Sequence, residues 1–236
     1  MTIEARERLI FALDVPSSDE AKRLLDRVGD AVGFVKIGLE LFTAAGPDIV
    51  RWTLAQDKRV FLDLKLFDIR ETVKRATVVA AEMGATFLSV HATGQTVQAA
   101  VEGRGNSPMK ILAVTVLTSF SEADLQETGV ADSISATVLR RASLAASSGA
   151  DGVVASGIEA AMIRRVLGRD PLIVTPGIRS IGRSHDDQIH VTTPAGAIAA
   201  GADYLVVGRP IRDAADPVAA AHAIQNEIEV ALTYGG

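Results

Sequence analysis

Three charged residues lie at and just beyond the end of one apolar segment, in the order Asp63, Lys65 and Asp68. Segment 59–66 alternates like a β-strand, so its leucines share one face while Asp63 and Lys65 share the other. Burying such charges costs several kcal/mol per ion unless they are paired. A structural ion pair explains two of the charges but not the third. Two carboxylates around one lysine keep it protonated and leave a negative field for an anion beside them. We therefore interpret the cluster as a reaction site.

Two further charged residues end neighbouring apolar segments. Asp14 follows segment 9–13, and Lys36 lies within segment 33–37. A lysine at a strand end commonly extends into solvent, but one placed next to Asp63 would extend the charged cluster. We therefore predict that lysine and aspartate alternating from the second and third strands form a network in which each charge is balanced by the others.

A second group of residues is suited to binding a phosphate. Gly208 allows an anion to approach the backbone, and Arg209 adds a positive charge at the start of a helix, where anions bind favourably. Arg179 ends an earlier strand-like motif. The polar segment 179–191 could close over a ligand, and Gln188 within it is a candidate hydrogen-bond donor.

Polar and charged residues recur along the chain where apolar segments stop, and this recurrence indicates a repeating strand–helix architecture. The first predicted helix begins after Ser17 or Ser18, and another spans about 70–83 with apolar residues at helical spacing. Eight segments read as strands: 9–13, 33–37, 59–66, 87–91, 111–117, 152–155, 172–175 and 204–207.

A weak internal repeat supports eight such units. Gly-Ala-Thr at 84–86 and Gly-Ala-Asp at 149–151 and 201–203 each lie between a helical pattern and a strand. Glycine there ends a helix in the left-handed conformation. Eight units in 236 residues is the size of a (β/α)8 TIM barrel, which we predict as one domain over 1–236. The alternative, an open doubly wound sheet, needs a glycine-rich turn after the first strand, and Asp14-Val15-Pro16-Ser17 is not one.

Composition excludes several classes of function. The 24 basic and 29 acidic residues give a net charge of −5, so the overall basic surface of a nucleic-acid binder is missing. The chain has no cysteine, which excludes disulfides, thiolate nucleophiles and cysteine-ligated metals. No apolar run is long enough to span a bilayer, and the first eight residues are too charged for a signal peptide. We expect a cytoplasmic protein with no membrane partner.

The motifs together resemble one known family. Asp63-Leu64-Lys65-Leu66-Phe67-Asp68 is similar to the D-x-K-x-x-D signature of orotidine 5′-monophosphate decarboxylases. That signature by itself indicates a wider barrel superfamily, but matching motifs follow in order along almost the whole chain. They are Ala12-Leu13-Asp14, Val35-Lys36-Ile37-Gly38, Val114-Thr115-Val116-Leu117-Thr118, Thr175-Pro176-Gly177-Ile178-Arg179, Asp187-Gln188, and Tyr204-Leu205-Val206-Val207-Gly208-Arg209-Pro210. The chain departs from the family at Arg70-Glu71, where members often have Pro-Asn. This difference bears on the conformation of the loop that follows Asp68.

The resemblance implies a carboxy-lyase that converts orotidine 5′-monophosphate to uridine 5′-monophosphate and carbon dioxide in pyrimidine synthesis, with neither metal nor organic cofactor. It implies a homodimer in which three residues reach the partner's site: Asp68, Ile69 and Thr72. Each subunit's own site would use Asp14, Lys36, Asp63 and Lys65, with Lys65 as proton donor. The remaining substrate contacts would be Thr118 and Pro176 at the pyrimidine, and Arg179, Gln188, Gly208 and Arg209 at the phosphate.

Three alternatives stay open. A metal-dependent relative acting on a sugar phosphate, such as hexulose-6-phosphate synthase, would carry an acidic residue at the end of the second strand, where this chain has Lys36. A non-catalytic nucleotide-binding barrel would bind nucleotide without forming product. An isomerase would need a general base, and Asp63 held between two lysines would be a poor one.

Overall fold

The computed structural model describes residues 3–179 and 192–234, so Gln188 and most of the segment expected to close over the ligand lie outside it. The strands are β1 (Leu9–Ala12), β2 (Phe34–Gly38), β3 (Arg59–Leu66), β4 (Phe87–His91), β5 (Lys110–Val114), β6 (Gly152–Val154), β7 (Leu172–Thr175) and β8 (Tyr204–Val207). The α-helices are α1 (Ser18–Val28), α2 (Leu39–Ala45), α3 (Pro47–Leu54), α4 (Arg70–Glu82), α5 (Gly94–Arg104), α6 (Glu122–Glu127), α7 (Ile134–Ser147), α8 (Gly157–Leu167), α9 (Pro194–Ala199), α10 (Arg209–Arg212) and α11 (Pro217–Tyr234). Two short 3₁₀ helices are η1 (Ala5–Glu7) and η2 (Gly29–Ala31). Among the described residues, no helix is long and apolar enough to cross a membrane.

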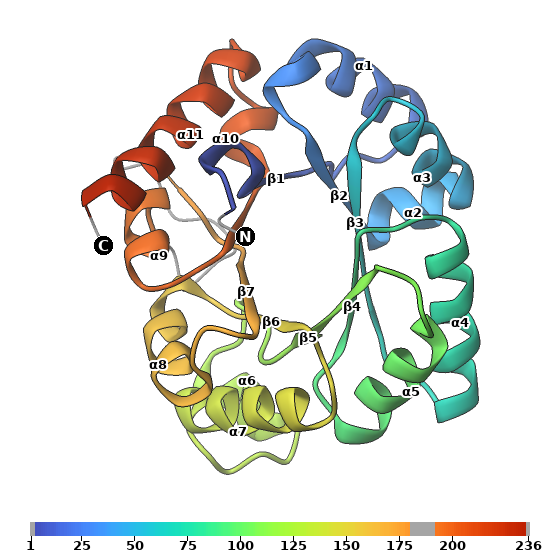
Figure 1. The fold of residues 1–236 in the computed structure, drawn as a ribbon, viewed down its shortest axis with the longest axis vertical. Helices are drawn as coiled ribbons and strands as arrows, with labels where there is room; N and C mark the ends of the chain where they lie inside the picture. The colour runs from blue at the N-terminus through green and yellow to red at the C-terminus, as the bar shows by residue number, and fades with distance from the viewer. Residues whose placement is uncertain (1–2, 180–191, 235–236) are drawn as a thin grey trace.

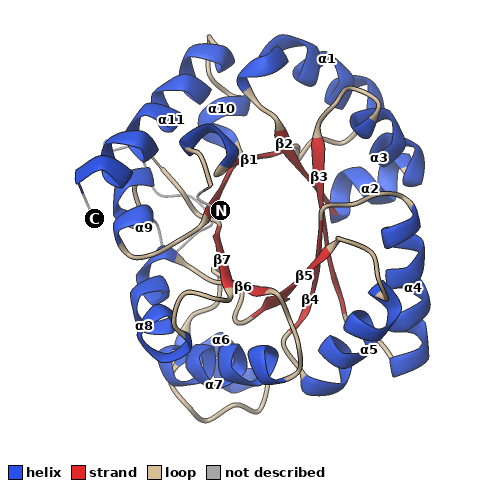
Figure 2. Cartoon of the chain, in the orientation of Figure 1, coloured by secondary structure: helices blue, strands red, loops and turns tan. Residues whose placement is uncertain are grey.

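The strands pair in sequence order and close into a barrel, because β1 pairs with both β2 and β8. Every pairing is parallel. Figures 1 and 2 show the strands in the centre and the helices in a ring around them. This closure confirms the predicted (β/α)8 barrel, and it excludes the open sheet, which would leave two edge strands unpaired. All carboxyl ends of the strands therefore meet at one end of the barrel.

Local signals in the sequence start and stop these elements. The Ser17 side chain accepts a hydrogen bond from the backbone N–H of Glu20 and caps α1. The predicted helix at 70–83 is found as α4. The fifth strand ends at Val114 rather than at residue 117. The Thr115 N–H still bonds to the Val154 carbonyl, but the residues after it turn away to line a cavity.

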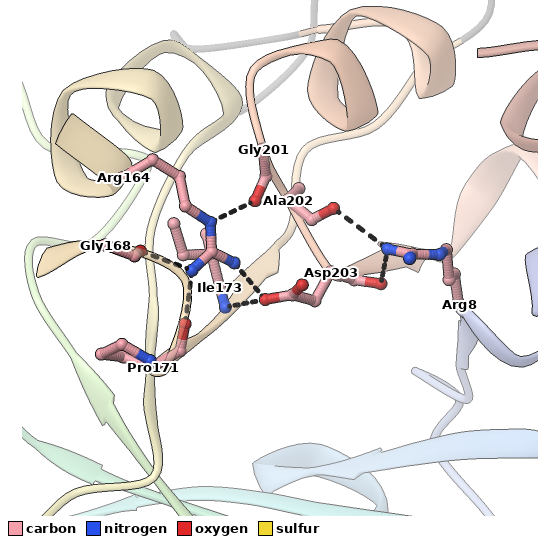
Figure 3. Close-up of polar contacts among 8 residues, drawn as sticks. All are labelled: Arg8, Arg164, Gly168, Pro171, Ile173, Gly201, Ala202 and Asp203. Carbon is pink, nitrogen blue, oxygen red and sulfur yellow. Dashed lines mark hydrogen bonds and ion pairs between the residues drawn. The ribbon is translucent and has the colours of Figure 1, made fainter. Parts of the chain in front are cut away.

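The repeated Gly-Ala-Asp motif fastens the amino ends of the strands. Gly201 has a φ of +99°, as the left-handed end of a helix requires, and the Asp203 carboxylate accepts a hydrogen bond from the Ile173 N–H at 2.8 Å. Arg164 of α8 pairs with the same carboxylate and also donates to the Gly201 carbonyl at 2.8 Å. Figure 3 shows this cluster, with Arg8 reaching the Asp203 carbonyl from the other side. The same arrangement recurs at 149–151, where Asp151 accepts from the Ile111 N–H.

The core is divided by the sheet into an outer layer and an inner layer. The outer layer packs the helices against the strands and includes the leucines of β3, as their alternation predicts. Inside the barrel, the first residues of β2, β4 and β8 are aromatic: Phe34, Phe87 and Tyr204. Their rings meet edge to face, with centroids 5.0 Å apart for Phe34–Phe87 and 5.1 Å for Phe87–Tyr204. These rings fill the amino-terminal end, so open space is left at the carboxyl-terminal end.

Candidate active site

A cavity of about 410 Å³ lies at the carboxyl ends of the strands. Its wall combines acidic, basic and apolar side chains. The lining residues are Ala12, Asp14, Lys36, Phe61, Asp63, Lys65, Val114, Val116, Leu117, Thr118, Val154, Ala155, Pro176, Gly177, Ile178, Arg179, Val206, Gly208, Arg209, Pro210 and Arg212. A cavity of this size is suited to a small-molecule ligand.

Four charged side chains, from β2, β3 and the segment just after β1, form one connected chain on the cavity wall. Lys36 Nζ lies 2.8 Å from Asp14 Oδ1 and 3.6 Å from Asp63 Oδ2. Lys65 Nζ donates to the same Asp63 oxygen at 2.8 Å. The central pair is largely withdrawn from water, since Lys36 is 8% and Asp63 7% exposed. The structure therefore brings together the predicted alternating network, in the order Asp14, Lys36, Asp63, Lys65.

The two lysines keep Asp63 ionised despite its burial. Burial raises the pKa of this carboxyl, but attraction to Lys36 and Lys65 and hydrogen bonds from Lys65 and Ser89 lower it further, so the pKa lies below its ordinary value. A carboxylate in this state is a weak base. A weak base at this position argues against the isomerase alternative, which needs a general base.

The backbone of Lys65 adopts an unusual conformation. Its φ is +50°, which for a residue with a β-carbon costs on the order of 1–3 kcal/mol. The cause lies in the register of β3 against β4, because Leu62 pairs with Leu88 while Leu66 pairs with Val90. Two extra residues of β3 are thus accommodated in a bulge that turns Lys65 into the cavity. Strict alternation predicted the direction of this side chain but not the bulge.

Asp68 does not complete the lysine cluster within a single chain. Its Oδ1 accepts a hydrogen bond from the Ile69 N–H at 2.6 Å, and no ion pair joins it to Lys65 in the described structure. Within one chain the second carboxylate therefore does not contact Lys65, and the expected place of Asp68 at the partner's site stays a prediction. The reason is that Asp68 lies past the end of β3, in the turn to α4, where it is exposed. Ile69 and Thr72 are exposed beside it and do not line the cavity.

The other residues predicted to bind substrate, apart from Gln188, lie on the cavity wall. Thr118, Pro176, Arg179, Gly208 and Arg209 are all among its lining residues. At Gly208 a β-carbon would lie 3.4 Å from Ala12 Cβ, so a larger residue would crowd the first strand. The cavity lining therefore includes the ammonium groups of the charged chain together with the guanidinium groups of Arg179 and Arg209.

Sequence reasoning missed Arg212, which also lines the cavity. Its Nη1 donates to the Asp14 carbonyl at 2.8 Å, while its Nε bonds to Asp213 at 2.6 Å. These contacts fasten the turn that carries Asp14, across 198 residues of sequence. In the sequence, its position one helical turn after Arg209 was the only sign that Arg212 belongs to the site.

The fold and the site together define a (β/α)8 barrel whose cavity at the carboxyl ends of the strands is lined by a chain of paired lysines and aspartates. In the described part of the chain, no group of three His, Asp or Glu side chains is placed to hold a metal ion. A family model described as "Orotidine 5'-phosphate decarboxylase / HUMPS family" matches residues 7–224. The chain therefore belongs to this family.

Individual relatives agree with this family over almost their whole lengths. The chain is 53% identical over 223 residues to an orotidine 5′-phosphate decarboxylase of Rhodopseudomonas palustris strain HaA2, covering 94% of this chain and 95% of that protein. It is 52% identical to one from Methylobacterium sp. strain 4-46, covering 94% and 96%. The crystal structure of the Lactobacillus acidophilus orotidine 5′-phosphate decarboxylase superimposes with a TM-score of 0.83 at 39% identity, covering 93% and 98%.

Proposed function

We propose that this chain is a carboxy-lyase that converts orotidine 5′-monophosphate to uridine 5′-monophosphate and carbon dioxide in de novo pyrimidine synthesis. The observation that carries the proposal is the Lys65 ammonium, held 2.8 Å from Asp63 on the cavity wall, in a chain that shares about half its residues with decarboxylases of this name. The D-x-K-x-x-D motif supports the choice of these residues, and the family match supports the reaction.

The chemistry calls for a fixed positive charge. When the bond from C6 to the carboxyl group breaks, the electron pair stays on C6 in the plane of the ring, where the π system cannot delocalise it. Lys65 stabilises that charge and then donates its proton from Nζ to C6, after which it regains a proton from water. Because its partner Asp63 is already ionised, the ammonium is in place before substrate arrives.

Asp63 has a second effect on the substrate. Its negative charge disfavours the substrate carboxylate beside it, and this repulsion is relieved as carbon dioxide leaves. Lys36 and Asp14 balance the remaining charge of the network and provide donors and acceptors for the ribose. Thr118 and Pro176, which also line the cavity, contact the pyrimidine.

The phosphate lies far from the bond that breaks. Arg209, Arg179 and the backbone at Gly208 bind it, together with Gln188, and this binding energy positions the ring against Lys65. A substrate without the phosphate would therefore lose rate as well as affinity.

A homodimer would complete the site. Asp68 is exposed and lies between two exposed apolar residues, Phe67 at 67% and Ile69 at 72% exposure. Exposed apolar side chains around a carboxylate suit a surface that a second copy covers. In the dimer, Asp68, Ile69 and Thr72 reach the partner's cavity and supply the second carboxylate beside its Lys65. A cytoplasmic location and the lack of nucleic-acid or membrane partners stay predictions.

The direct test adds orotidine 5′-monophosphate to protein stripped of metal by a chelator and follows loss of the orotate absorbance together with release of carbon dioxide. Full activity in chelator is expected. Activity that returns only with magnesium, or turnover of a sugar phosphate instead, would favour the metal-dependent alternative. Nucleotide binding without product would favour a non-catalytic barrel.

A further inference from the structure

A buried hydroxyl group connects the backbone of Lys65 to the carboxylate that pairs with its side chain. Ser89 of β4 is fully buried, and its Oγ accepts a hydrogen bond from the Lys65 N–H at 2.9 Å. The same Oγ donates its proton to Asp63 Oδ1 at 2.7 Å. The direction of both bonds is fixed, because the backbone N–H can only donate and the ionised carboxylate can only accept.

These two hydrogen bonds act on the two features that set the direction of the ammonium group. The first satisfies the backbone N–H of Lys65 in the bulge, where φ is +50° and the regular ladder to β4 is interrupted. The second occupies Asp63 Oδ1, while Lys65 and Lys36 lie 2.8 Å and 3.6 Å from Oδ2. Both carboxylate oxygens are thereby held, so the plane of the carboxylate cannot rotate away from Lys65.

We propose that Ser89 is a positioning residue for the decarboxylation, holding the bulge at Lys65 and the Asp63 carboxylate in the single arrangement that aims the ammonium at the reacting carbon. Ser89 does not line the cavity, so it acts through these two residues. The inference rests on the function proposed above.

The predicted effect on pH dependence concerns Asp63 and its neighbours. The charged and titratable groups around it are Lys36 from β2, Lys65 on β3 itself, Asp14 beyond Lys36, and His91 at the end of β4 near Lys65. Ser89 is the neutral donor in this set, and it helps to lower the pKa of Asp63. Removing the hydroxyl therefore raises that pKa and leaves the lysines in place.

The test compares Ser89→Ala with Thr115→Val. Thr115 is a matched control because it is also a buried hydroxyl near a strand end, 1% exposed, and it donates to the Val154 carbonyl at 3.0 Å outside the charged network. For Ser89→Ala we expect kcat to fall about 10- to 100-fold, as for a misaimed catalytic group, with KM within about threefold of wild type. The acidic limb of the kcat–pH profile should move to higher pH. Thr115→Val should keep the wild-type kcat and pH profile.

A merely structural role would not move the pH profile. Ser89→Thr, which keeps the hydroxyl, should recover most of the kcat. If Ser89→Ala folds poorly, Ser89→Cys keeps the volume and weakens the donor, and the same shift of the acidic limb is expected. An unmoved limb in the folded variant, or a kcat within twofold of wild type, overturns the proposal.

The wild-type assay separates this proposal from the proposed function. A wild-type chain that leaves orotidine 5′-monophosphate unchanged removes both. A wild-type chain that consumes it, alongside a Ser89→Ala variant with the same kcat and pH profile, removes only the role of Ser89.

Discussion

Replacing Lys65 with alanine removes both functions assigned to its ammonium group. The side chain is 29% exposed, so an effective dielectric constant near 20 applies, and one unit charge about 4 Å from the developing carbanion is worth about 4 kcal/mol. That energy corresponds to about three decades of rate. The lost proton donor adds about two to four decades. We therefore expect kcat to fall about 10⁵- to 10⁷-fold.

Nucleotide binding should largely persist in Lys65→Ala, because the phosphate end of the cavity is built from other residues. Asp63 keeps Lys36 at 3.6 Å, so the variant should fold. Turnover would be followed by orotate absorbance and binding of uridine 5′-monophosphate by calorimetry. Lys110→Ala is a matched control, since Lys110 is a strand lysine paired with Asp151 at 3.0 Å outside the cavity lining. A Lys65→Ala kcat within tenfold of wild type would refute the reasoning.

Four further outcomes are expected. Arg209→Ala should weaken binding of the phosphorylated substrate about 10- to 100-fold, because a charged hydrogen bond is lost. An equal loss of affinity for phosphate-free orotidine would show that Arg209 does not bind the phosphate. Mixing Asp68→Ala with Lys65→Ala protein should regenerate some active sites, and no recovery after proven subunit exchange would contradict the shared site. The pKa of Asp63 is lowered on folding, so its stabilising contribution is complete above about pH 4 and is lost as pH falls through the folded pKa. The unfolding free-energy difference between wild type and Asp63→Asn should therefore shrink in acid, and a difference that stays constant between pH 7 and pH 3 would contradict this. Phe87→Ala should lower the free energy of unfolding by about 3–5 kcal/mol in denaturant titrations, and a loss below about 1 kcal/mol would show that the inner aromatic layer is not needed.

Much of the charged site follows from local pattern. Alternation in β3 places Asp63 and Lys65 on the face opposite the leucines, and the end of an apolar strand is where barrel chemistry lies. Asp68 shows the limit of such reasoning. Its position two residues past the strand was visible, but the direction of its side chain depends on the turn into α4, which has no periodicity to read.

By itself, the sequence determined the eight-unit barrel, the family resemblance and the charged residues at the strand ends, because these depend on residue type and on short-range spacing. Only the tertiary structure decided which groups meet. Ser89 meets Asp63 and Lys65 because β3 and β4 pair with a bulge, and Arg212 meets the Asp14 carbonyl because the barrel closes between β8 and β1. Such contacts depend on strand register and closure, which join residues 24 to 198 positions apart and leave no mark in any local pattern.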